Sequence, residues 1–383
     1  MGSTHAGVGR TSARVRGLLV EVKGEGLYLP ALDLWLDPRG GGERAFVSHA
    51  HGDHGGLDRG AGSILASVQT LALLAARRAT PLHDARALEW GESIELPIAA
   101  DHGGGTARLS IAPAGHVLGA AQLIVDHPGG RLVYTGDYRT GPGATHATGA
   151  PVPCDELVIE STFGLPIFRF PPRDATLARI VDWCRAALDE GEVPVLLGYA
   201  LGKAQELVHA SLAAGLPTVA HGAVHRVCAA YEALGVSLGV GDGRLIPYAS
   251  WTATRERDRT AAVIVAPPQT QGQPMIRKMR RARVAYVSGW ALIDAAVEQR
   301  RADAGFALSD HADYDDLIDT ARATGARRVY ATHGDDPALF ARLLHEATGV
   351  ETRALESAPL DGPLDGAASP TTTTTTSGPE AVG

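Results

Sequence analysis

The sequence predicts an α/β protein in which one domain interrupts another, and three observations support this prediction. The chain has 383 residues, which is room for about two domains of roughly 150 residues each. Short apolar segments typical of buried strands alternate with longer segments typical of helices. Several apolar segments lead directly to His, Asp or Glu, a pattern that stops in the middle of the chain and resumes after about residue 305.

The composition excludes several classes of protein. Hydrophobic residues make up 45% of the chain and charged residues 20%, so the chain can bury a sizeable core. No segment approaches the roughly 18 to 20 uninterrupted apolar residues of a membrane helix, and the start of the chain lacks the apolar core of a secretory signal. We therefore expect a cytoplasmic protein without a membrane partner. The three cysteines are far apart and form no CxxC pair, which is typical of free thiols in a reducing compartment.

The first part of the chain, to about residue 165, has more strand and turn signals than helix signals. Residues 45–48, 132–135 and 157–159 are apolar runs that lead to a histidine, an aspartate and a glutamate. Another strand is predicted at 109–112. A buried strand that delivers a polar residue at its carboxyl end is the usual arrangement of an α/β active site.

The middle of the chain alternates strands with helices, which predicts a smaller domain with a parallel sheet. The predicted strands are 193–197, 217–220, 263–266 and 284–288, with a basic helical segment between the last two. The predicted helices are 173–190, one from about 202, one from 223, and later 313–324 and 337–348.

We therefore predict a discontinuous domain of residues 16–165 and 305–362, interrupted by an inserted domain of residues 166–304. Residues 1–15 and 363–383 are rich in small and polar residues, and the second of these segments contains six consecutive threonines. Such composition predicts disordered, solvated tails.

The strongest chemical signal is the sequence HAHGDH at residues 49–54, directly after an apolar strand. Its candidate ligands His49, His51, Asp53 and His54 cannot all face one way on a strand or helix, but a tight loop turning at Gly52 can bring them together. Imidazoles with a carboxylate and no thiolate suit Zn²⁺, with Mn²⁺ or Fe as alternatives. A polar loop with incidental histidines is the plain alternative.

His116 and Asp137 each follow a predicted strand and add two candidate ligands. Together with the HAHGDH loop they resemble the metallo-β-lactamase superfamily, which implies an αβ/βα sandwich with a metal pair at one sheet edge. The resemblance implies that His49, His51 and His116 hold one metal, that Asp53 and His54 hold the other, and that Asp137 bridges them. Two such cations can generate a hydroxide at neutral pH, so the resemblance predicts a hydrolase.

Three later segments narrow the resemblance: ESTFG at 160–164, SDHADY at 309–314 and THGD at 332–335. They resemble motifs A, B and C of the β-CASP branch, the nucleic-acid-cutting metallo-β-lactamases, in which a parallel-sheet domain is inserted between motifs A and B. GKAQE at 202–206 is similar to a helix start of that branch. The resemblance implies that His333 completes the second metal site and that Glu160 and His311 act at the leaving-group side, with Asp53 also counted as catalytic. In the plain alternatives, Glu160 caps or forms a salt bridge, His333 is a loop histidine, and His311 orients a ligand or contacts phosphate.

Within this branch, the span CDELVIESTFGLPIFRF at 154–170 is most similar to the bacterial ligase-associated DNA exonucleases. That resemblance implies two divalent metal ions (Zn²⁺, with Mn²⁺ as the alternative), DNA in preference to RNA as substrate, and a functional link to an ATP-dependent DNA ligase and a helicase. In the implied reaction a metal-bridging hydroxide attacks phosphorus, while His311, oriented by Glu160, protonates the leaving oxygen. The alternatives are an RNA-processing β-CASP ribonuclease, a small-molecule hydrolase and a catalytically inactive β-CASP scaffold.

Basic residues of the inserted domain are candidate contacts for nucleic acid. The net charge of −8 argues against unspecific coating of DNA but leaves room for a local basic groove. Residues 277–283 carry five cations on a predicted helix, which suits phosphate contact or, alternatively, a solvated face. Lys203 is predicted either to bind phosphate or simply to begin a helix. The candidates are Lys203, Arg277, Lys278, Arg280 and Arg281.

Overall fold

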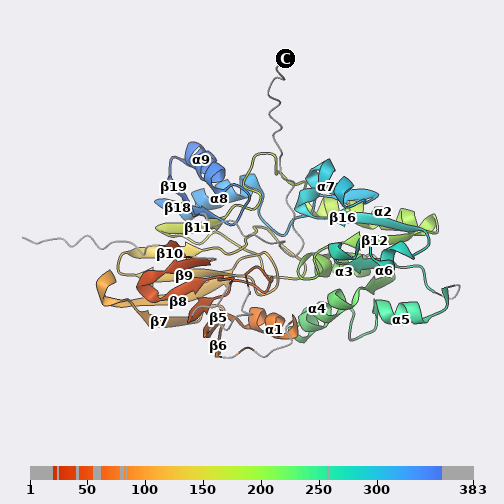
Figure 1. The fold of residues 1–383 in the computed structure, drawn as a ribbon, viewed down its shortest axis with the longest axis horizontal. Coiled ribbons are helices and arrows are strands. Elements are labelled where there is room, and N and C mark those ends of the chain that lie inside the picture. The colour runs from red at the N-terminus through yellow and green to blue at the C-terminus, as the bar shows by residue number, and fades with distance from the viewer. Residues whose placement is uncertain are drawn as a thin grey trace, which may run out of the picture.

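Three β-sheets with flanking helices make up the computed structural model of the chain (Figure 1). It describes residues 20–23, 26–39, 43–54, 62–77, 82, 84–256 and 259–355. The predicted tails at 1–15 and 363–383 lie outside the described residues. None of the helices in the described part of the chain has the length and apolar character needed to cross a membrane.

The first sheet has the strand order β1-β2-β3-β4-β5-β6. Its strands are β1 (Glu21–Lys23), β2 (Gly26–Leu29), β3 (Leu34–Leu36), β4 (Arg44–Phe46), β5 (Ser63–Ser67) and β6 (Ala85–Leu88). Helix α1 (Val68–Arg77) follows β5 and packs on it and on β6. The apolar side chains of the opposite face, such as Leu29 and Phe46, are fully buried against the second sheet.

The second sheet has the order β19-β18-β11-β10-β9-β8-β7. Its strands are β7 (Ser93–Pro97), β8 (Thr106–Pro113), β9 (Ala121–His127), β10 (Gly130–Tyr134), β11 (Glu156–Glu160), β18 (Arg328–Thr332) and β19 (Glu351–Ala354). Its outer face is covered by α8 (Tyr314–Thr324) and α9 (Pro337–Thr348), whose Leu317 and Phe340 are fully buried. The layers helix, sheet, sheet, helix confirm the predicted αβ/βα sandwich.

Strands β10, β11 and β18 are parallel neighbours in this sheet. Strand β18 lies beside β11 although more than 160 residues separate them in sequence, with Glu160 paired in register with Thr332. Because parallel strands end at the same edge of a sheet, the residues that follow these three strands meet there.

The third sheet is entirely parallel and has the order β14-β13-β15-β12-β16-β17. Its strands are β12 (Val193–Leu197), β13 (Thr218–Ala220), β14 (Leu245–Pro247), β15 (Val263–Ala266), β16 (Ala282–Val287) and β17 (Ala304–Phe306). On one face pack α2 (Arg173–Asp189), α3 (Lys203–Ala213) and α4 (Gly222–Ala233). On the other lie α5 (Tyr248–Ala253), α6 (Pro274–Arg277) and the region of α7 (Asp294–Gln299).

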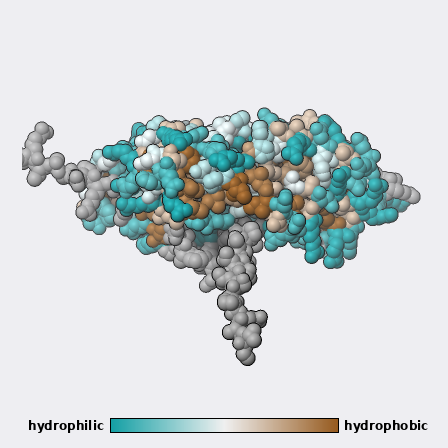
Figure 2. Space-filling model, turned by 90° about the horizontal axis from the view of Figure 1, so that it is seen from above, coloured by the Kyte–Doolittle hydropathy of each residue, from teal (hydrophilic) through white to brown (hydrophobic). Residues whose placement is uncertain are grey.

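The parallel third sheet agrees with the strand–helix alternation expected for the inserted segment. Its last strand passes the predicted boundary at residue 304 by two residues, and the division into domains remains a prediction. Helices α1 and α4 pack against each other and join the two parts of the molecule (Figure 1). The face in Figure 2 is mostly hydrophilic, with hydrophobic residues gathered near its middle.

The basic segment at 277–283 does not form the predicted helix. Helix α6 ends at Arg277, a turn follows in which Arg281 has a φ of +58°, and Arg283 already belongs to β16. The prediction was wrong because the apolar residues from Val284 onward pair with β12, and this pairing draws the adjoining basic residues into an extended strand.

Candidate metal centre

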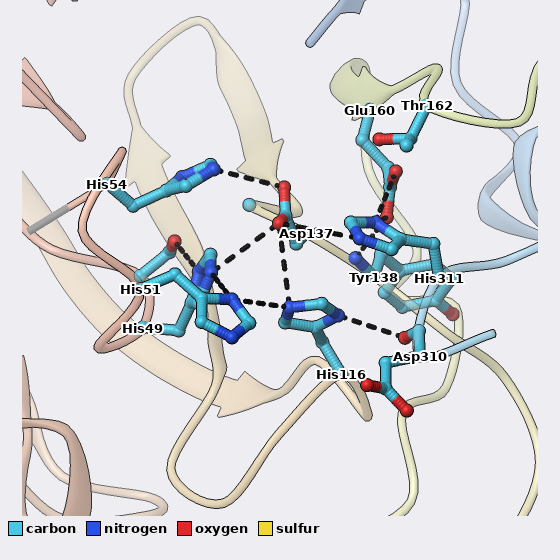
Figure 3. A network of polar contacts seen from close by, with 12 residues as sticks. His49, His51, His54, His116, Asp137, Tyr138, Glu160, Thr162, Asp310 and His311 are labelled. Atoms are coloured by element: carbon cyan, nitrogen blue, oxygen red, sulfur yellow. Dashed lines mark hydrogen bonds and ion pairs between the residues drawn. The ribbon is translucent and has the colours of Figure 1, made fainter. Parts of the chain in front are cut away.

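The predicted ligands come from four loops that meet at one edge of the two stacked sheets (Figure 3). The HAHGDH loop follows β4, and His116 lies in the connection from β8 to β9. Asp137 follows β10 and His333 follows β18, at the shared carboxyl edge of the parallel strands. A φ of +46° at His333 turns the chain immediately after β18.

Three imidazoles and one carboxylate converge on a single point. His51 Nδ1 lies 2.9 Å from His49 Nε2 and 3.1 Å from His116 Nε2. Asp137 Oδ2 lies 3.4 Å from His49 Nε2 and 3.5 Å from His116 Nε2. One ligand atom from each of these residues falls within 4.8 Å of the others. Imidazole nitrogens with a carboxylate oxygen are the donor set of a divalent-metal site, and Zn²⁺ fits it well.

The other ring nitrogen of each of these histidines is held by a neighbour. His49 Nδ1 lies 3.0 Å from Ser48 Oγ. His51 Nε2 lies 3.1 Å from the Leu201 carbonyl oxygen, and His116 Nδ1 lies 2.9 Å from that of Asp310. A carbonyl only accepts hydrogen bonds, so the nitrogen beside it carries the hydrogen and the other is free to bind a metal.

Burial keeps these imidazoles neutral, as metal ligands must be. It lowers the pKa of His49 and His116 well below the ordinary value and that of His51 to about 4. Burial also raises the pKa of Asp137 to about 6, so this carboxylate needs nearby positive charge to stay ionised. The residues of this group therefore fit a bound cation.

The remaining predicted ligands are arranged more loosely around Asp137. His54 Nε2 lies 3.3 Å from Asp137 Oδ1 and 4.0 Å from Asp53 Oδ2, and the Asp53 side chain is half exposed. The His333 ring lies 4.9 Å from the His54 ring, and its Nδ1 atom is buried without a hydrogen-bond partner among the described residues. A buried nitrogen without a hydrogen-bond partner is suited to bind a metal ion. Within the described ranges, however, neither Asp53 nor His333 belongs to a ligand group as tight as the first.

Asp37 is a functional residue that the sequence reasoning missed. Its buried carboxylate accepts hydrogen bonds from the Ser48 amide (2.7 Å), the Tyr134 hydroxyl (2.7 Å) and His54 Nδ1 (2.9 Å). Burial alone would raise the pKa of Asp37, but the neighbouring His54 and the hydrogen bonds from His54 and Ser48 lower it. Asp37 thus orients His54 and the start of the HAHGDH loop. The available signal was the sequence LDP at 36–38, in which an aspartate follows an apolar segment shortly before the HAHGDH loop.

Glu160 and His311 form a pair beside the first ligand group (Figure 3). Both carboxylate oxygens of the fully buried Glu160 lie within 3.0 Å of His311 Nδ1, and the Tyr138 amide also donates to Oε1. His311 Nε2 lies 3.9 Å from Asp137 Oδ2. Burial opposes ionisation of His311, but the charges of Glu160 and Asp137 outweigh it and raise its pKa to about 9. Because Nδ1 is held by Glu160, Nε2 of His311 is the atom that can donate a proton.

Lys203 is not available to nucleic acid, so its prediction as a phosphate contact was wrong. The side chain is 2% exposed, and its Nζ lies 2.7 Å from Asp310 Oδ1. In contrast, four of the five cations of the basic segment are exposed, although Arg281 donates to the carbonyl of Glu190. These exposed candidates are Arg277, Lys278, Arg280 and Arg281, and their contact with nucleic acid remains a prediction.

Comparison with known proteins gives matches to a family of metallo-hydrolase domains and to proteins named as a DNA ligase, an endoribonuclease and a polyadenylation factor subunit. The family described as "Zn-dependent metallo-hydrolase RNA specificity domain" matches residues 304–355. A probable DNA ligase of Opitutus terrae is 35% identical over 335 residues, which are 86% of this chain but 30% of that protein. Endoribonuclease ysh1 of Emericella nidulans is 38% identical over 105 residues, 26% of this chain and 12% of its own.

A third relative, cleavage and polyadenylation specificity factor subunit 3 of Dictyostelium discoideum, is 32% identical over 126 residues, 32% of this chain and 16% of its own. The chain thus spans less than a third of the length of each of these relatives. The match at 304–355 covers the strand and loop that carry His311 and His333, and the similarity to the ligase extends over most of the described structure.

Proposed function

Because this chain belongs to the β-CASP branch of the metallo-β-lactamase superfamily, we propose that it is a metal-dependent nuclease that degrades DNA as an exonuclease. The observation that carries the proposal is the Glu160–His311 pair, placed 3.9 Å from the carboxylate of Asp137. A phosphodiester releases an alkoxide, which is a poor leaving group, and a positioned acid beside the reacting centre relieves that difficulty.

In this proposal, His49, His51 and His116 would hold one divalent ion and Asp53, His54 and His333 a second, and Asp137 would serve both. Two such ions, Zn²⁺ or alternatively Mn²⁺, lower the pKa of a bound water and offset negative charge on phosphoryl oxygens.

The chain's own residues supply proton transfer and orientation. Glu160 fixes the His311 ring through Nδ1 and stabilises its charged form, so Nε2 is the atom that gives a proton to the departing sugar oxygen. Phe163 is buried, and its ring centroid lies 5.9 Å from that of His311. Phe163 therefore keeps bulk water from one side of the pair.

The choice of DNA rests on the long similarity to a protein named as a probable DNA ligase. The same similarity supports a functional link of this nuclease to a DNA ligase, whereas ATP dependence of that ligase and a link to a helicase are implied by the sequence resemblance alone. The second candidate is an RNA-processing nuclease with the same machinery. It is favoured by the matched family, which is described as an RNA specificity domain, and by the shorter similarity to an endoribonuclease.

The decisive experiment digests end-labelled DNA and RNA of matched sequence, side by side, with the Zn²⁺- or Mn²⁺-loaded protein. We expect DNA to shorten progressively from one end while RNA stays intact. Preferential cutting of RNA would support the second candidate instead. Loss of cutting in Asp53→Ala, with the protein still folded, would tie the activity to this centre. Cleavage of neither polymer by the loaded protein would contradict the nuclease proposal.

A further inference from the structure

Residues 201–206, which follow β12 and include the first turn of α3, lie directly against the first ligand group. The Leu201 carbonyl oxygen lies 3.1 Å from His51 Nε2 and fixes which nitrogen of that ring faces the metal position. The inserted part of the chain therefore contributes to the metal centre without providing a ligand.

Lys203 makes the second connection. Its buried ammonium donates to Asp310 Oδ1 at 2.7 Å. The main-chain carbonyl oxygen of the same Asp310 lies 2.9 Å from His116 Nδ1 (Figure 3). The next residue in the chain is His311. One ion pair thus joins α3 to the loop that orients a metal ligand and carries the proposed acid.

The geometry of the segment leaves little freedom for this contact to shift. Gly202 has a φ of +88°, and a Cβ atom there would collide with Val117 and lie 3.3 Å from Asp310 Oδ2. The Gly202 amide donates to Gln205 Oε1 at 2.7 Å, which closes the turn before α3. Only glycine allows the segment to approach the His116 loop this closely.

A second buried pair supports the same loop from the other side. Arg173 donates to the Ser309 carbonyl at 3.0 Å, and its guanidinium lies 2.9 Å from Glu206 Oε2. Glu206 in turn accepts from the amide and the hydroxyl of Thr145. Each charge of this cluster therefore has a partner of opposite sign, and the partners come from both parts of the molecule.

We propose that Lys203 is a positioning residue of the metal centre. Its ion pair fixes Asp310, whose carbonyl then holds the His116 ring with Nε2 toward the metal position. The proposal rests on the metal centre assigned under the proposed function. It implies that metal affinity depends on contact between the inserted sheet and the rest of the chain, because movement of segment 201–206 would release both His51 and His116.

The test measures Co²⁺ binding by the full chain through its visible absorption, without any nucleic acid. The variants are Lys203→Met, which removes the ion pair, and Lys203→Met combined with Asp310→Asn, which also removes the buried carboxylate that would be left with Arg173 alone, 3.8 Å away. Arg328→Met is the matched control, because it breaks the half-buried ion pair with Glu156 at the opposite end of β18 and β11. The unfolding midpoint of each metal-free variant is measured in parallel.

We expect Co²⁺ to bind about tenfold more weakly to both Lys203 variants, with an altered absorption spectrum. A loss of this size is usual when a residue that orients a metal ligand is removed. The control should bind Co²⁺ like the wild type. In the double variant the midpoint should recover while the affinity stays low, and this variant decides the matter if Lys203→Met does not fold. Unchanged affinity, or recovery of affinity together with the midpoint, would overturn the positioning role. Failure of the wild type to bind Co²⁺ would instead contradict the metal centre itself.

Discussion

The proton donor proposed for the leaving group depends on one buried carboxylate. Both oxygens of Glu160 contact His311 Nδ1, so Glu160→Gln removes the charge that favours the imidazolium while keeping the shape of the side chain. We expect DNA hydrolysis to slow by about 10²- to 10⁴-fold, the usual contribution of a positioned acid. The metal content should stay unchanged, since Glu160 is not grouped with His49, His51 and His116, and both of its carboxylate oxygens contact His311 instead.

A substrate with a better leaving group makes this prediction specific. A 4-nitrophenyl phosphodiester releases a phenolate that needs little protonation, so Glu160→Gln and His311→Ala should both cleave it at nearly the wild-type rate. Equal losses on DNA and on the nitrophenyl ester would show that the pair does not act as a proton donor.

Asp37 carries a second prediction at the level of single residues. Asp37→Asn removes the carboxylate that orients His54, so the metal that His54 binds should be held about 10- to 100-fold more weakly. Metal analysis after dialysis should then find a loss of up to one ion per chain. Asp33→Asn is a suitable control, because Asp33 has the same φ of +47° and accepts from Tyr28, but at an exposed position. Equal metal content in both variants would contradict the role of Asp37.

The sequence predicted the ligand types well at this scale but not the residues that support them. HAHGDH carries its chemistry within six residues, so its pattern is visible in one segment. Lys203 and Asp310 are 107 residues apart, and Asp37 and Tyr134 are 97 apart. Such pairs form only when the chain folds. The prediction that Lys203 binds phosphate was wrong because the sequence does not show whether a lysine side chain is exposed to phosphate or paired with a buried carboxylate.

Among the elements, the helices with clear capping residues were the most predictable. Helix α8 begins with Asp313, whose side chain accepts from the Asp316 amide, and ends at Gly325 in the left-handed conformation. Such caps are local signals and can be read from sequence. The short strands β14 and β17, with three residues each, were missed, because their conformation comes from pairing with β13 and β16 rather than from their own residues.

The connection after α4 supports a prediction about pH. Glu232 accepts hydrogen bonds from the amides of Leu238, Val240 and Gly241. Burial would raise the pKa of Glu232, but these bonds outweigh it and lower the pKa. Stability from a group whose pKa is lowered on folding is present above the unfolded pKa and is lost as the pH falls through the folded pKa.

We therefore expect Glu232→Gln to lower the unfolding midpoint at pH 7 and to narrow its difference from the wild type as the pH falls below about 4.3, the ordinary value for glutamate. Thermal unfolding followed by circular dichroism between pH 7 and 3 measures this difference. A gap of constant size over the whole range would show that the Glu232 charge does not contribute.

At the scale of the whole molecule, the resemblance gave the sandwich and the strand patterns predicted the interruption, but local patterns gave strands without their order. The neighbours β11 and β18 lie on either side of the inserted segment, and no local signal shows that they pair. Yet this pairing places Glu160 and Ser161 beside His333, with the Ser161 amide donating to the His333 carbonyl at 2.9 Å. The site therefore forms only when β11 and β18, which are far apart in the sequence, come together.

Metal removal should therefore destabilise the whole fold. Chelation leaves several buried imidazoles and the Asp137 carboxylate without a cation at the place where four loops meet. At a free Zn²⁺ concentration 100 times the dissociation constant, binding adds about 2.7 kcal/mol to the free energy of unfolding. Thermal unfolding should show a higher midpoint as Zn²⁺ is added back, and Mg²⁺ should have less effect because it prefers oxygen ligands. A midpoint independent of Zn²⁺ would contradict a metal centre of this kind.

The acidic charge of the chain leads to the last prediction, on where DNA contacts the surface. With a net charge of −8, the protein as a whole repels a polyanion, so binding must depend on local groups of cations. Arg277, Lys278 and Arg280 are exposed, and replacing all three with Ala should reduce the slope of log Kd against log salt by up to about one unit per lost phosphate contact.

The control for net charge is a triple Ala variant on the far part of the molecule. It replaces the exposed residues Arg322, Arg342 and Arg353. Fluorescence anisotropy with a labelled single strand, over a series of salt concentrations, measures both slopes. An equal change in the two variants would mean that net charge, and not the basic segment, governs binding.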